Sequence, residues 1–378
     1  MDTPDLLSEL IAFPSVSDTS NAEISEFVES RLQSLGFEIE RLTYHDAERI
    51  LKVCVCARRG PGGRGLAYFC HTDVVPADSW SFPHSGPWSA WQAEGRMYGR
   101  GACDMKGSLA CMLHAAERIA ATDRPIFVVC TADEETGYHG ARQVAQESEI
   151  FHEIVSSQSR GIIGEPTNLQ VVYAHKGGRA GKITAHGVAA HSSTAEGQNA
   201  NLAMIPYLVE LRALCLECEQ SPEWQDDRFD PPTISMNIGI TDHTPAINIT
   251  PGRSVCTFYF RPTPGQDADG LVDRIEAMAT AHGLQFERLF DGEPLFTDPE
   301  STFIRNLAQL TGTQPGTVAY GTDGAELGAM QDLAVLGPGD IRQAHTDDEW
   351  ISLEQLEQGT QLYASLMRHW CIDDVSPE

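Results

Sequence analysis

The sequence has few positive charges, no long apolar run and no basic leader. Lys and Arg number 26 against 54 Asp and Glu in 378 residues, which gives a net charge of −28 at pH 7, spread along the chain. Such a surface repels the phosphates of nucleic acids and of anionic lipids. No segment approaches the roughly 18 uninterrupted apolar residues of a membrane span, and the N-terminal segment is acidic where a secretory signal would be basic. We therefore expect a cytoplasmic protein that binds neither nucleic acid nor membrane.

The ten cysteines do not have the pattern of a disulfide framework. Cys70, Cys111 and Cys130 stand in apolar runs, where a buried free thiol is the common state. Cys215 and Cys218 have CxxC spacing, but they stand in a helical pattern and no second CxxC accompanies them. A zinc or redox site is therefore disfavoured for this pair, and any other role stays open.

Strands and helices alternate along most of the chain. Short apolar runs predict buried strands, and apolar residues at three-to-four spacing predict helices. Helices are predicted over 5–35, interrupted at Pro14, and over 107–121, and strands over 51–56, 66–70, 126–130, 161–163 and 334–336. This order predicts an α/β fold in which a mostly parallel sheet is flanked by helices.

A different order of elements appears between residues 179 and 289. Strands are predicted over 179–185, 233–240, 254–261 and 284–289, and helices over 201–219 and 271–281. The order strand, helix, strand, strand, helix, strand predicts an inserted ferredoxin-like (split βαβ) domain. The chain thus divides into a discontinuous domain of residues 1–178 and 290–378 and an inserted domain of residues 179–289.

Histidines and acidic residues follow the predicted strands where the strands end. They are His71 and Asp73, Glu134 and Glu135, Glu165, and His345, with Asp104 in a glycine-rich segment. Taken singly, each is ordinary as a loop cap, a turn residue or a surface charge. Because ligands of open α/β sheets gather beyond the carboxyl ends of the strands, we expect these side chains to converge. Two histidines with several carboxylates and no cysteine suit Zn²⁺, Co²⁺ or Mn²⁺, and Asp73 is placed to accept the second N–H of the His71 ring.

Four segments together carry a specific resemblance. They are residues 71–76 (HTDVVP), 99–107 (GRGACDMKG), 133–137 (DEETG) and 164–167 (GEPT). In order and spacing they resemble the successive motifs of the di-zinc amidohydrolase and metallopeptidase family of acetylornithine deacetylase, succinyl-diaminopimelate desuccinylase, aminoacylase and glutamate carboxypeptidase. The resemblance covers nearly the whole chain. It implies an enzyme that hydrolyses the amide bond of an N-acyl amino acid.

The resemblance also implies a role for each clustered residue. His71 and Glu165 would bind one metal ion, Glu135 and His345 the other, and Asp104 would bridge the two. Zn²⁺ is the favoured metal, with Co²⁺ or Mn²⁺ as alternatives. A hydroxide bridging the two ions would attack the amide carbonyl, Glu134 would be the general base, and Asp73 would complete the catalytic set. A cis peptide bond between Asp104 and Met105 is implied as well.

The inserted domain matches the same family in one further motif. Residues 187–193 (GVAAHSS) resemble a lid segment whose histidine, here His191, reaches the partner subunit's active site and stabilises the oxyanion. Ala190 stands where the family usually has glycine, which leaves the histidine in place. Residues 179–289 would then be a lid and dimerisation domain, and the protein a homodimer. Without the resemblance, a helix cap or strand-end contact would be favoured for His191.

Contacts with a small N-acyl amino acid substrate are implied at four more positions. Asn248 and Arg261 match residues that bind the substrate's carboxylate, and Gly321 and Thr322 fall in a substrate-contacting loop. On their residue types alone, Asn248 would be a turn residue and Arg261 a surface cation.

Two segments favour N-acetylornithine as the substrate, cleaved to acetate and ornithine in arginine biosynthesis. Residues 164–177 (GEPTNLQVVYAHKG) and 336–349 (LGPGDIRQAHTDDE) are most similar to acetylornithine-cleaving members, whereas residues 100–104 (RGACD) fit the desuccinylase motif equally well. Succinyl-diaminopimelate desuccinylase and broader N-acyl-amino-acid hydrolase or carboxypeptidase activities therefore stay open. A catalytically inactive metal-binding homologue is the alternative of another class. The presence of Glu134, Asp104 and both histidines disfavours it.

Overall fold

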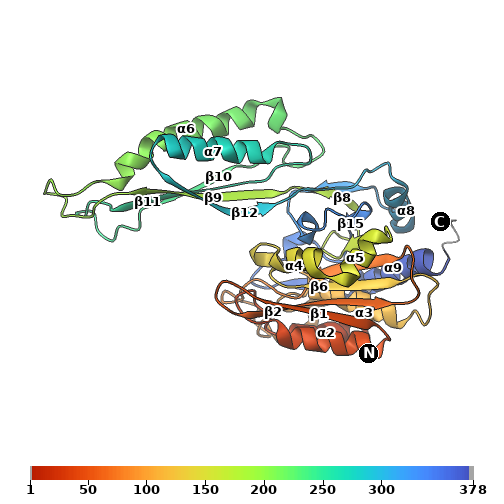
Figure 1. Cartoon of the computed structure of the whole chain (residues 1–378). Helices are drawn as coiled ribbons and strands as arrows, with labels where there is room; N and C mark the ends of the chain where they lie inside the picture. Colours follow the sequence, from red (N-terminus) through yellow and green to blue (C-terminus); the bar gives the residue numbers. More distant parts are fainter. Residues whose placement is uncertain (1, 374–378) are drawn as a thin grey trace. The chain divides into compact units, whose positions relative to one another are not determined.

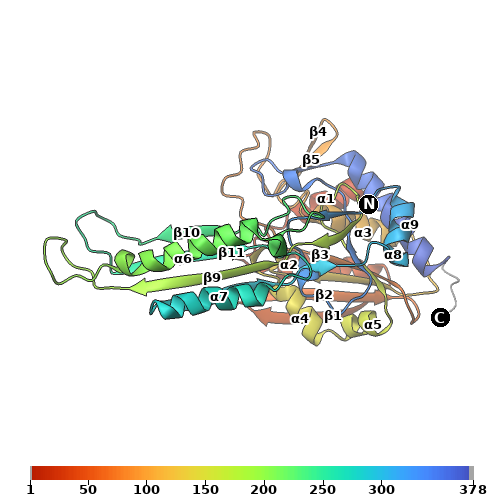
Figure 2. The same ribbon diagram turned by 90° about the horizontal axis from the view of Figure 1, so that it is seen from above.

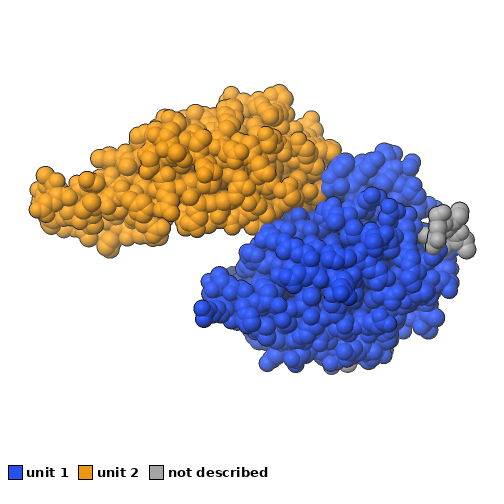
Figure 3. All heavy atoms as spheres, in the orientation of Figure 1, with its two compact units in different colours: residues 1–174, 296–316, 322–378 blue, residues 175–295, 317–321 orange. Residues whose placement is uncertain are grey.

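The computed structural model describes residues 2–373, which fall into two compact units (Figure 3). Within these residues, unit 1 comprises 2–174, 296–316 and 322–373, and unit 2 comprises 175–295 and 317–321. The chain therefore leaves unit 1, builds unit 2 and returns. The assignment of residues 179–289 as a lid and dimerisation domain stays a prediction.

Unit 1 is built on a nine-stranded sheet with the order β1-β2-β6-β3-β7-β15-β8-β13, in which β14 pairs with β8. The strands are β1 (Glu38–His45), β2 (Leu51–Arg59), β3 (Leu66–His71), β6 (Ile126–Thr131), β7 (Arg160–Ile163), β8 (Val172–His175), β13 (Leu295–Phe296), β14 (Gly316–Val318) and β15 (Leu333–Val335). The central strands β6, β3, β7 and β15 are parallel, and β2 and β8 run antiparallel to them. All residues of the four parallel strands are buried, as expected for a sheet covered on both faces.

Helices cover both faces of this sheet (Figure 1). They are α1 (Thr3–Ile11), α2 (Ala22–Ser34), α3 (Lys106–Glu117), α4 (His139–Glu147), α5 (Glu149–Ser156), α8 (Thr302–Thr311) and α9 (Leu353–Cys371). Tyr68 of β3 belongs to the core that the sheet shares with α1, α2, α3, α8 and α9. The next residue, Phe69, packs edge-on against Phe151 of α5, with ring centroids 6.3 Å apart. Successive residues of a strand point to opposite faces, so the predicted α/β class with a flanked, mostly parallel sheet is confirmed. Among the described residues, no helix is both long and apolar enough to cross a membrane.

Unit 2 contains a four-stranded antiparallel sheet with two helices on one face (Figures 1 and 2). Its elements are β9 (Gly178–His186), α6 (Ala200–Gln220), β10 (Asn237–Thr241), β11 (Arg253–Phe260), α7 (Ala268–Ala281) and β12 (Gln285–Gly292), and the sheet order is β10-β11-β9-β12. This is the predicted order of elements. The strand predicted from residue 233 begins only at Asn237, because Ser235 has a left-handed φ of 51° that an extended strand does not contain.

A third sheet of three short strands supports the segment that carries Asp104. It consists of β4 (Trp91–Ala93), β5 (Arg96–Tyr98) and β16 (Trp350–Ser352), in the order β16-β5-β4. β5 leads into the segment 99–104, and β16 follows the segment of His345. Pairing of β5 with β16 thus brings together two parts of the chain that are some 250 residues apart.

Candidate metal centre

The carboxyl ends of neighbouring parallel strands carry several of the predicted residues. His71 is the last residue of β3, Glu134 and Glu135 follow β6 in the 3₁₀ turn η1 (Glu134–Thr136), and Glu165 follows β7. His71 is in register with Thr131 at the end of β6. The strands therefore end at one edge of the sheet, where the loops that follow them converge.

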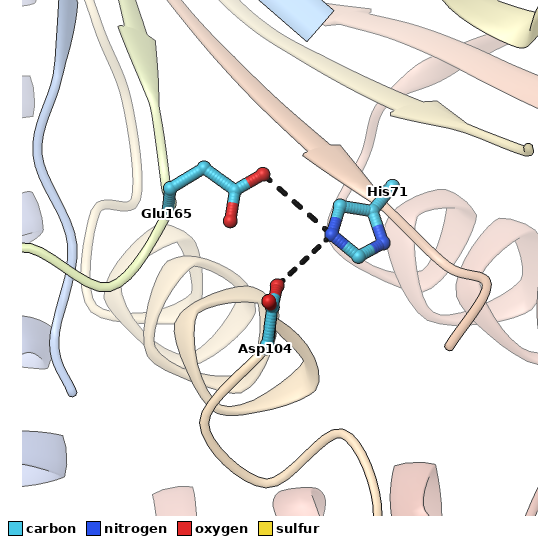
Figure 4. A group of neighbouring side chains, drawn as sticks. All are labelled: His71, Asp104 and Glu165. Carbon is cyan, nitrogen blue, oxygen red and sulfur yellow. Dashed lines mark hydrogen bonds and ion pairs between the residues drawn. The ribbon is translucent and has the colours of Figure 1, made fainter. Parts of the chain in front are cut away.

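His71, Asp104 and Glu165 form a buried group (Figure 4). Nε2 of His71 lies 3.1 Å from Oδ1 of Asp104 and 3.6 Å from Oε1 of Glu165. On the other side of the ring, Nδ1 lies 2.9 Å from the carbonyl oxygen of Asp73. That carbonyl accepts the Nδ1 proton, so Nε2 can present a lone pair toward the two carboxylates.

Asp104, Glu135 and His345 form a second group, which shares Asp104 with the first. Nε2 of His345 lies 3.3 Å from Oδ2 of Asp104 and 3.2 Å from Oε1 of Glu135. Asp104 therefore directs one carboxylate oxygen toward each histidine. The Asp104–Met105 peptide bond is cis, as the resemblance implied.

The donor atoms and their spacing fit two divalent ions. In each group the ligand atoms lie within 4.8 Å of one another, and the histidine–carboxylate distances run from 3.1 to 3.6 Å. A tetrahedral ion with bonds of roughly 2.0–2.2 Å separates its ligand atoms by about 3.3–3.6 Å. Imidazole nitrogens and carboxylate oxygens are the ligands that such an ion accepts, and the shared Asp104 stands where a bridging carboxylate would.

The charges of the centre also call for a cation. Burial raises the pKa of Glu165 well above its ordinary value, and the neighbouring charge of Asp104 adds to this. Hydrogen bonds with Asp104 and Glu135 raise the pKa of His345 to about 10. Burial opposes protonation of His71, yet Asp104 and Glu165 raise its pKa well above the ordinary value. Protons and metal ions therefore compete for the same donor atoms, and metal affinity should fall at low pH.

Glu134 belongs to neither of the two groups, although it precedes Glu135. Burial raises its pKa well above the ordinary value; His71 opposes this shift, whereas Glu165 and Glu135 add to it. The turn that carries both glutamates is held by Asp73, whose Oδ1 accepts the N–H of Glu134 at 3.2 Å and whose Oδ2 accepts the N–H of Glu135 at 3.3 Å. Asp73 thus fixes the backbone of both residues whose carboxylates lie side by side in the sequence.

The predicted contact between Asp73 and the second N–H of the His71 ring is present, but the acceptor is a backbone atom. The backbone carbonyl of Asp73, and not its carboxylate, is the acceptor for the ring, since the carboxylate Oδ1 lies 3.7 Å away. The carboxylate is occupied by the two N–H groups of the turn and by the hydroxyl of Ser17, which donates to it at 2.7 Å. Asp73 therefore orients the His71 ring and the turn of Glu134 and Glu135 with different atoms.

The predicted lid and carboxylate-binding residues belong to unit 2. His191 forms a β-bridge with Ile249, and the N–H of the next residue, Ser192, donates to the carbonyl of Asn248 at 3.0 Å, so His191 and Asn248 are neighbours. Arg261 follows β11, and its guanidinium carbon lies 4.9 Å from the centre of the Tyr259 ring. The roles of these residues toward a substrate stay predictions.

The two loop residues predicted to contact substrate fall on either side of a unit boundary. Gly321 ends the second segment of unit 2, and Thr322 begins the last segment of unit 1. The hydroxyl of Thr322 accepts the N–H of Gly324 at 3.0 Å and so caps the 3₁₀ turn η3 (Asp323–Ala325). A role in substrate binding stays a prediction for both.

Buried charged residues near the centre were not predicted. Glu349 is hydrogen-bonded to the segment of Asp104, Nζ of Lys52 lies 2.7 Å from Oδ1 of Asp133, and Asp323 accepts a hydrogen bond from Thr131. Burial raises the pKa of Asp323 to about 7. Asp133, Asp323 and Glu349 could have been found from the sequence, because they adjoin or lie within the motif segments. Lys52 could not, because it stands in an ordinary strand pattern.

All ten cysteines are free. Cys218 is buried in the core of unit 2, and Sγ of Cys215 lies 3.1 Å from Sδ of Met236. Neither belongs to a metal-ligand group among the described residues.

The fold and the shared-carboxylate centre together are those of a metal-dependent hydrolase, and comparison with known proteins gives the family. Residues 67–369 match the peptidase family M20/M25/M40. An acetylornithine deacetylase from Myxococcus xanthus is 32% identical over 393 residues, which covers 97% of this chain and 96% of the relative. The chain therefore belongs to the M20/M25/M40 peptidase family and is a metal-dependent hydrolase.

Solved structures of this family share the fold. An M20-family metallo-carboxypeptidase from Sulfolobus solfataricus superposes with a TM-score of 0.75 at 18% identity, covering 97% of this chain and 99% of the other. A dinuclear metal-binding peptidase of the M20 family from Bacillus subtilis gives a TM-score of 0.66 at 14% identity, covering 97% and 96%. At these identities the likeness concerns the fold alone.

Proposed function

We propose that the protein is a dinuclear amidohydrolase that cleaves N-acetylornithine to acetate and ornithine. The observation that carries the reaction class is the position of Asp104, whose two oxygens face His71 and His345 at 3.1 and 3.3 Å. The full-length similarity to a protein named acetylornithine deacetylase supports the substrate. Zn²⁺ is the favoured metal, with Co²⁺ and Mn²⁺ as alternatives. We expect the reaction to take place in the cytoplasm.

The proposed ligands divide between two ions that share one bridge. The first ion would take His71 and Glu165, the second would take Glu135 and His345, and Asp104 would be shared between them. When bound, the ions supply Lewis acidity, which polarises the scissile carbonyl and lowers the pKa of the attacking water.

Glu134 moves the proton in this scheme. Its carboxylate takes a proton from the attacking water and delivers it to the nitrogen of the leaving amine as the C–N bond breaks. A base of raised pKa suits the second step, because a carboxyl group that holds its proton more tightly is a better match for an amine. Asp73 keeps the turn of Glu134 in place through its two backbone hydrogen bonds while the proton moves.

Residues outside the metal centre would recognise the rest of the substrate. His191 would stabilise the oxyanion that forms when the carbonyl is attacked, and Arg261 with Asn248 would bind the α-carboxylate. Gly321 and Thr322 would contact the substrate from their loop. An Arg that stacks on Tyr259 is held in one orientation, which favours a two-pronged contact with a carboxylate.

We further propose that the protein forms a homodimer through residues 179–289. The two edges of the unit 2 sheet differ in how well they could pair with a strand of a second copy. The β12 edge is interrupted by a bulge between Arg288 and Phe290 and carries ion pairs such as Lys182–Glu287, features that discourage strand addition. β10 (NIGIT) contains no charge and no bulge, and among the described strands it pairs with β11 alone. β10 is therefore the edge that a second copy can extend.

Helix α6 adds an apolar surface beside this edge. It contacts both ends of β10, since Asn201 donates to Asp242 at 2.7 Å and Cys215 touches Met236. Its outward face exposes an apolar stripe: Leu202 (66% exposed), Ile205 (50%) and Val209 (65%) follow three-to-four spacing, and Leu216 (37%) lies seven residues further on. Such a spacing suits a neighbouring helix. A two-fold axis beside β10 would cover the stripe and the strand edge together.

A substrate panel tests the proposed reaction. The protein, loaded with Zn²⁺ or with Co²⁺, is given N-acetylornithine, N-succinyl-diaminopimelate, other N-acetyl amino acids and dipeptides. We expect the highest kcat/KM for N-acetylornithine. A higher kcat/KM for N-succinyl-diaminopimelate or for a dipeptide would assign one of the alternative reactions. A fully metal-loaded protein that hydrolyses none of them would support the inactive homologue.

A further inference from the structure

Glu349 is a buried carboxylate (1% exposed) whose hydrogen bonds all reach the segment that ends at Asp104. Oε1 accepts the N–H of Cys103 at 2.8 Å and the N–H of Asp104 at 3.0 Å. Oε2 accepts the N–H of Gly101 and a guanidinium N–H of Arg100, both at 2.9 Å. One side chain thus holds three backbone N–H groups, including that of Asp104 itself.

The backbone of Glu349 is fixed in the same place. Its carbonyl accepts the N–H of Gly99 at 3.0 Å, and the next residue, Trp350, begins β16, where it pairs with Tyr98 of β5. His345 lies four residues earlier in the same segment. The segment that supplies one histidine therefore also supplies the carboxylate that grips the backbone of Asp104.

Charge balance alone does not account for this arrangement. A buried carboxylate needs a partner, and Arg100 would suffice for Glu349 through a two-pronged ion pair. Instead, Arg100 contributes one hydrogen bond, and its other nitrogen, Nη2, donates to the carbonyl of Pro76 at 3.2 Å. The other hydrogen bonds of the Glu349 carboxylate come from backbone N–H groups. They fix the peptide groups on both sides of Cys103, and the second of these peptide groups joins Cys103 to Asp104.

We propose that Glu349 is a positioning residue of the metal centre, which holds the backbone of Asp104 so that its two oxygens face His71 and His345 before the ions bind. Partners that orient metal ligands in this way are typically worth about 10–100-fold in metal affinity. Because Asp104 belongs to both groups, release of its backbone weakens the binding of both ions. Loss of Glu135 or Glu165, each of which belongs to one group, weakens the binding of one ion.

The inference rests on Asp104 as the proposed bridge but not on which amide is hydrolysed, so metal binding tests it without a substrate. Metal-free wild type, Glu349→Gln, Glu349→Asp and Asp104→Asn are titrated with Zn²⁺ against a chromophoric chelator, and the stoichiometry is followed with Co²⁺ absorption. Glu354→Gln is the matched control, since Glu354 lies on the exposed face of α9 five residues further on. We expect both Kd values to rise about 10–100-fold in Glu349→Gln, to rise less in Glu349→Asp, which keeps the charge, and to stay unchanged in Glu354→Gln.

Three results would overturn the proposal. The first is that Glu349→Gln binds Zn²⁺ with a Kd within about twofold of wild type while Asp104→Asn binds it weakly. The proposed ligands would then stand, but Glu349 would have no positioning role. The second is normal binding by Asp104→Asn, which removes the bridge as well. The third is that neither Glu349 variant folds while Asp104→Asn does, as judged by metal-free melting curves, since Glu349 would then serve the fold and not the centre.

Discussion

At the scale of single residues, Glu134 and Glu135 are neighbours with different expected roles. Glu134→Gln keeps the shape of the side chain but cannot take a proton, so kcat should fall by about 10²–10⁴-fold while two metal ions stay bound. Glu135→Gln should instead lose one ion, because Glu135 belongs to the group of Asp104 and His345. Steady-state kinetics and metal analysis of both variants check this. If Glu134→Gln contains half the metal of the wild type, Glu134 is a metal ligand and the assignment is wrong.

His175 gives unit 2 a dependence on pH. It is fully buried, and burial lowers its pKa to about 4; the hydrogen bond to the carbonyl of Lys176 opposes this shift, and the charge of Arg261 adds to it. In the unfolded chain a histidine has a pKa near 6.5, so the unfolded state takes up the proton first as the pH falls. The stability that the neutral ring contributes above pH 6.5 is therefore lost between about pH 6.5 and 4, at up to about 1.4 kcal/mol per pH unit.

Replacement of this ring should flatten that dependence. In metal-free protein, His175→Gln should lower the melting temperature at pH 7 and reduce the further fall between pH 6.5 and 4.5. His152→Gln, at an exposed position of α5, is the control and should keep the wild-type slope. Calorimetric melting curves measure the difference between the proteins. An unchanged slope in His175→Gln would show that other groups account for the acid loss of stability.

At the scale of elements, the centre depends on a close approach of the segments that follow β7 and β15. A Cβ atom at Gly337 would lie 2.2 Å from the carbonyl oxygen of Gly164 and 2.6 Å from that of Glu165. Gly337→Ala must therefore push the two segments apart, at a cost of about 1–3 kcal/mol of stability, and move Glu165 away from His71. Urea unfolding and Zn²⁺ titration should show lower stability and weaker binding of one ion. Gly328→Ala, where a Cβ meets nothing within 4 Å, should change neither.

Several elements of unit 1 were predicted from their local pattern, whereas others, including β1, α4, α5, α8 and α9, were not. β3, β6 and β7 are short apolar runs, and α3 has regular apolar spacing, so each could be read from the sequence alone. β1 carries charged and half-exposed side chains at most of its positions. Helices α4 and α5 are short and are separated by Ser148 alone, which caps the second by accepting the N–H of Phe151. Each has one apolar face, but at nine and eight residues neither helix is long enough to be stable without packing against the rest of the unit.

The candidate centre shows the same limit at the level of atoms. The residue types and the strand ends gave a wider candidate cluster that also contained Asp73 and Glu134. The resemblance assigned His71, Asp104, Glu135, Glu165 and His345 as ligands, and the structure brings these five together. The hydrogen bonds of Glu349 to the segment of Asp104 depend on the pairing of β5 with β16, which joins distant parts of the chain. Contacts of this kind follow from the fold and have no signature in the local sequence.

At the scale of the whole molecule, the proposed dimer makes a prediction about the surface of α6. Val209→Glu places a charge in the middle of the exposed stripe and should convert dimers to monomers, because a charge buried without a partner costs several kcal/mol. Leu289→Glu is the matched control: Leu289 is 51% exposed on β12, the edge that the proposal leaves free. Light scattering after size exclusion measures both. Dimers that survive Val209→Glu would place the interface elsewhere.

The dimer and the proposed role of His191 can be tested together by mixing two inactive chains. Glu134→Gln removes the base, and His191→Ala removes the lid histidine. If His191 acts in the partner's site, a mixed dimer contains one site with both residues intact, and random exchange of equal amounts should restore about a quarter of wild-type activity. Exchange is verified with two affinity tags, since chains that do not exchange cannot restore activity. Verified mixed dimers that remain inactive would show that His191 serves its own chain or none. Recovery of activity in the Val209→Glu background, where dimers should not form, would contradict the proposed interface.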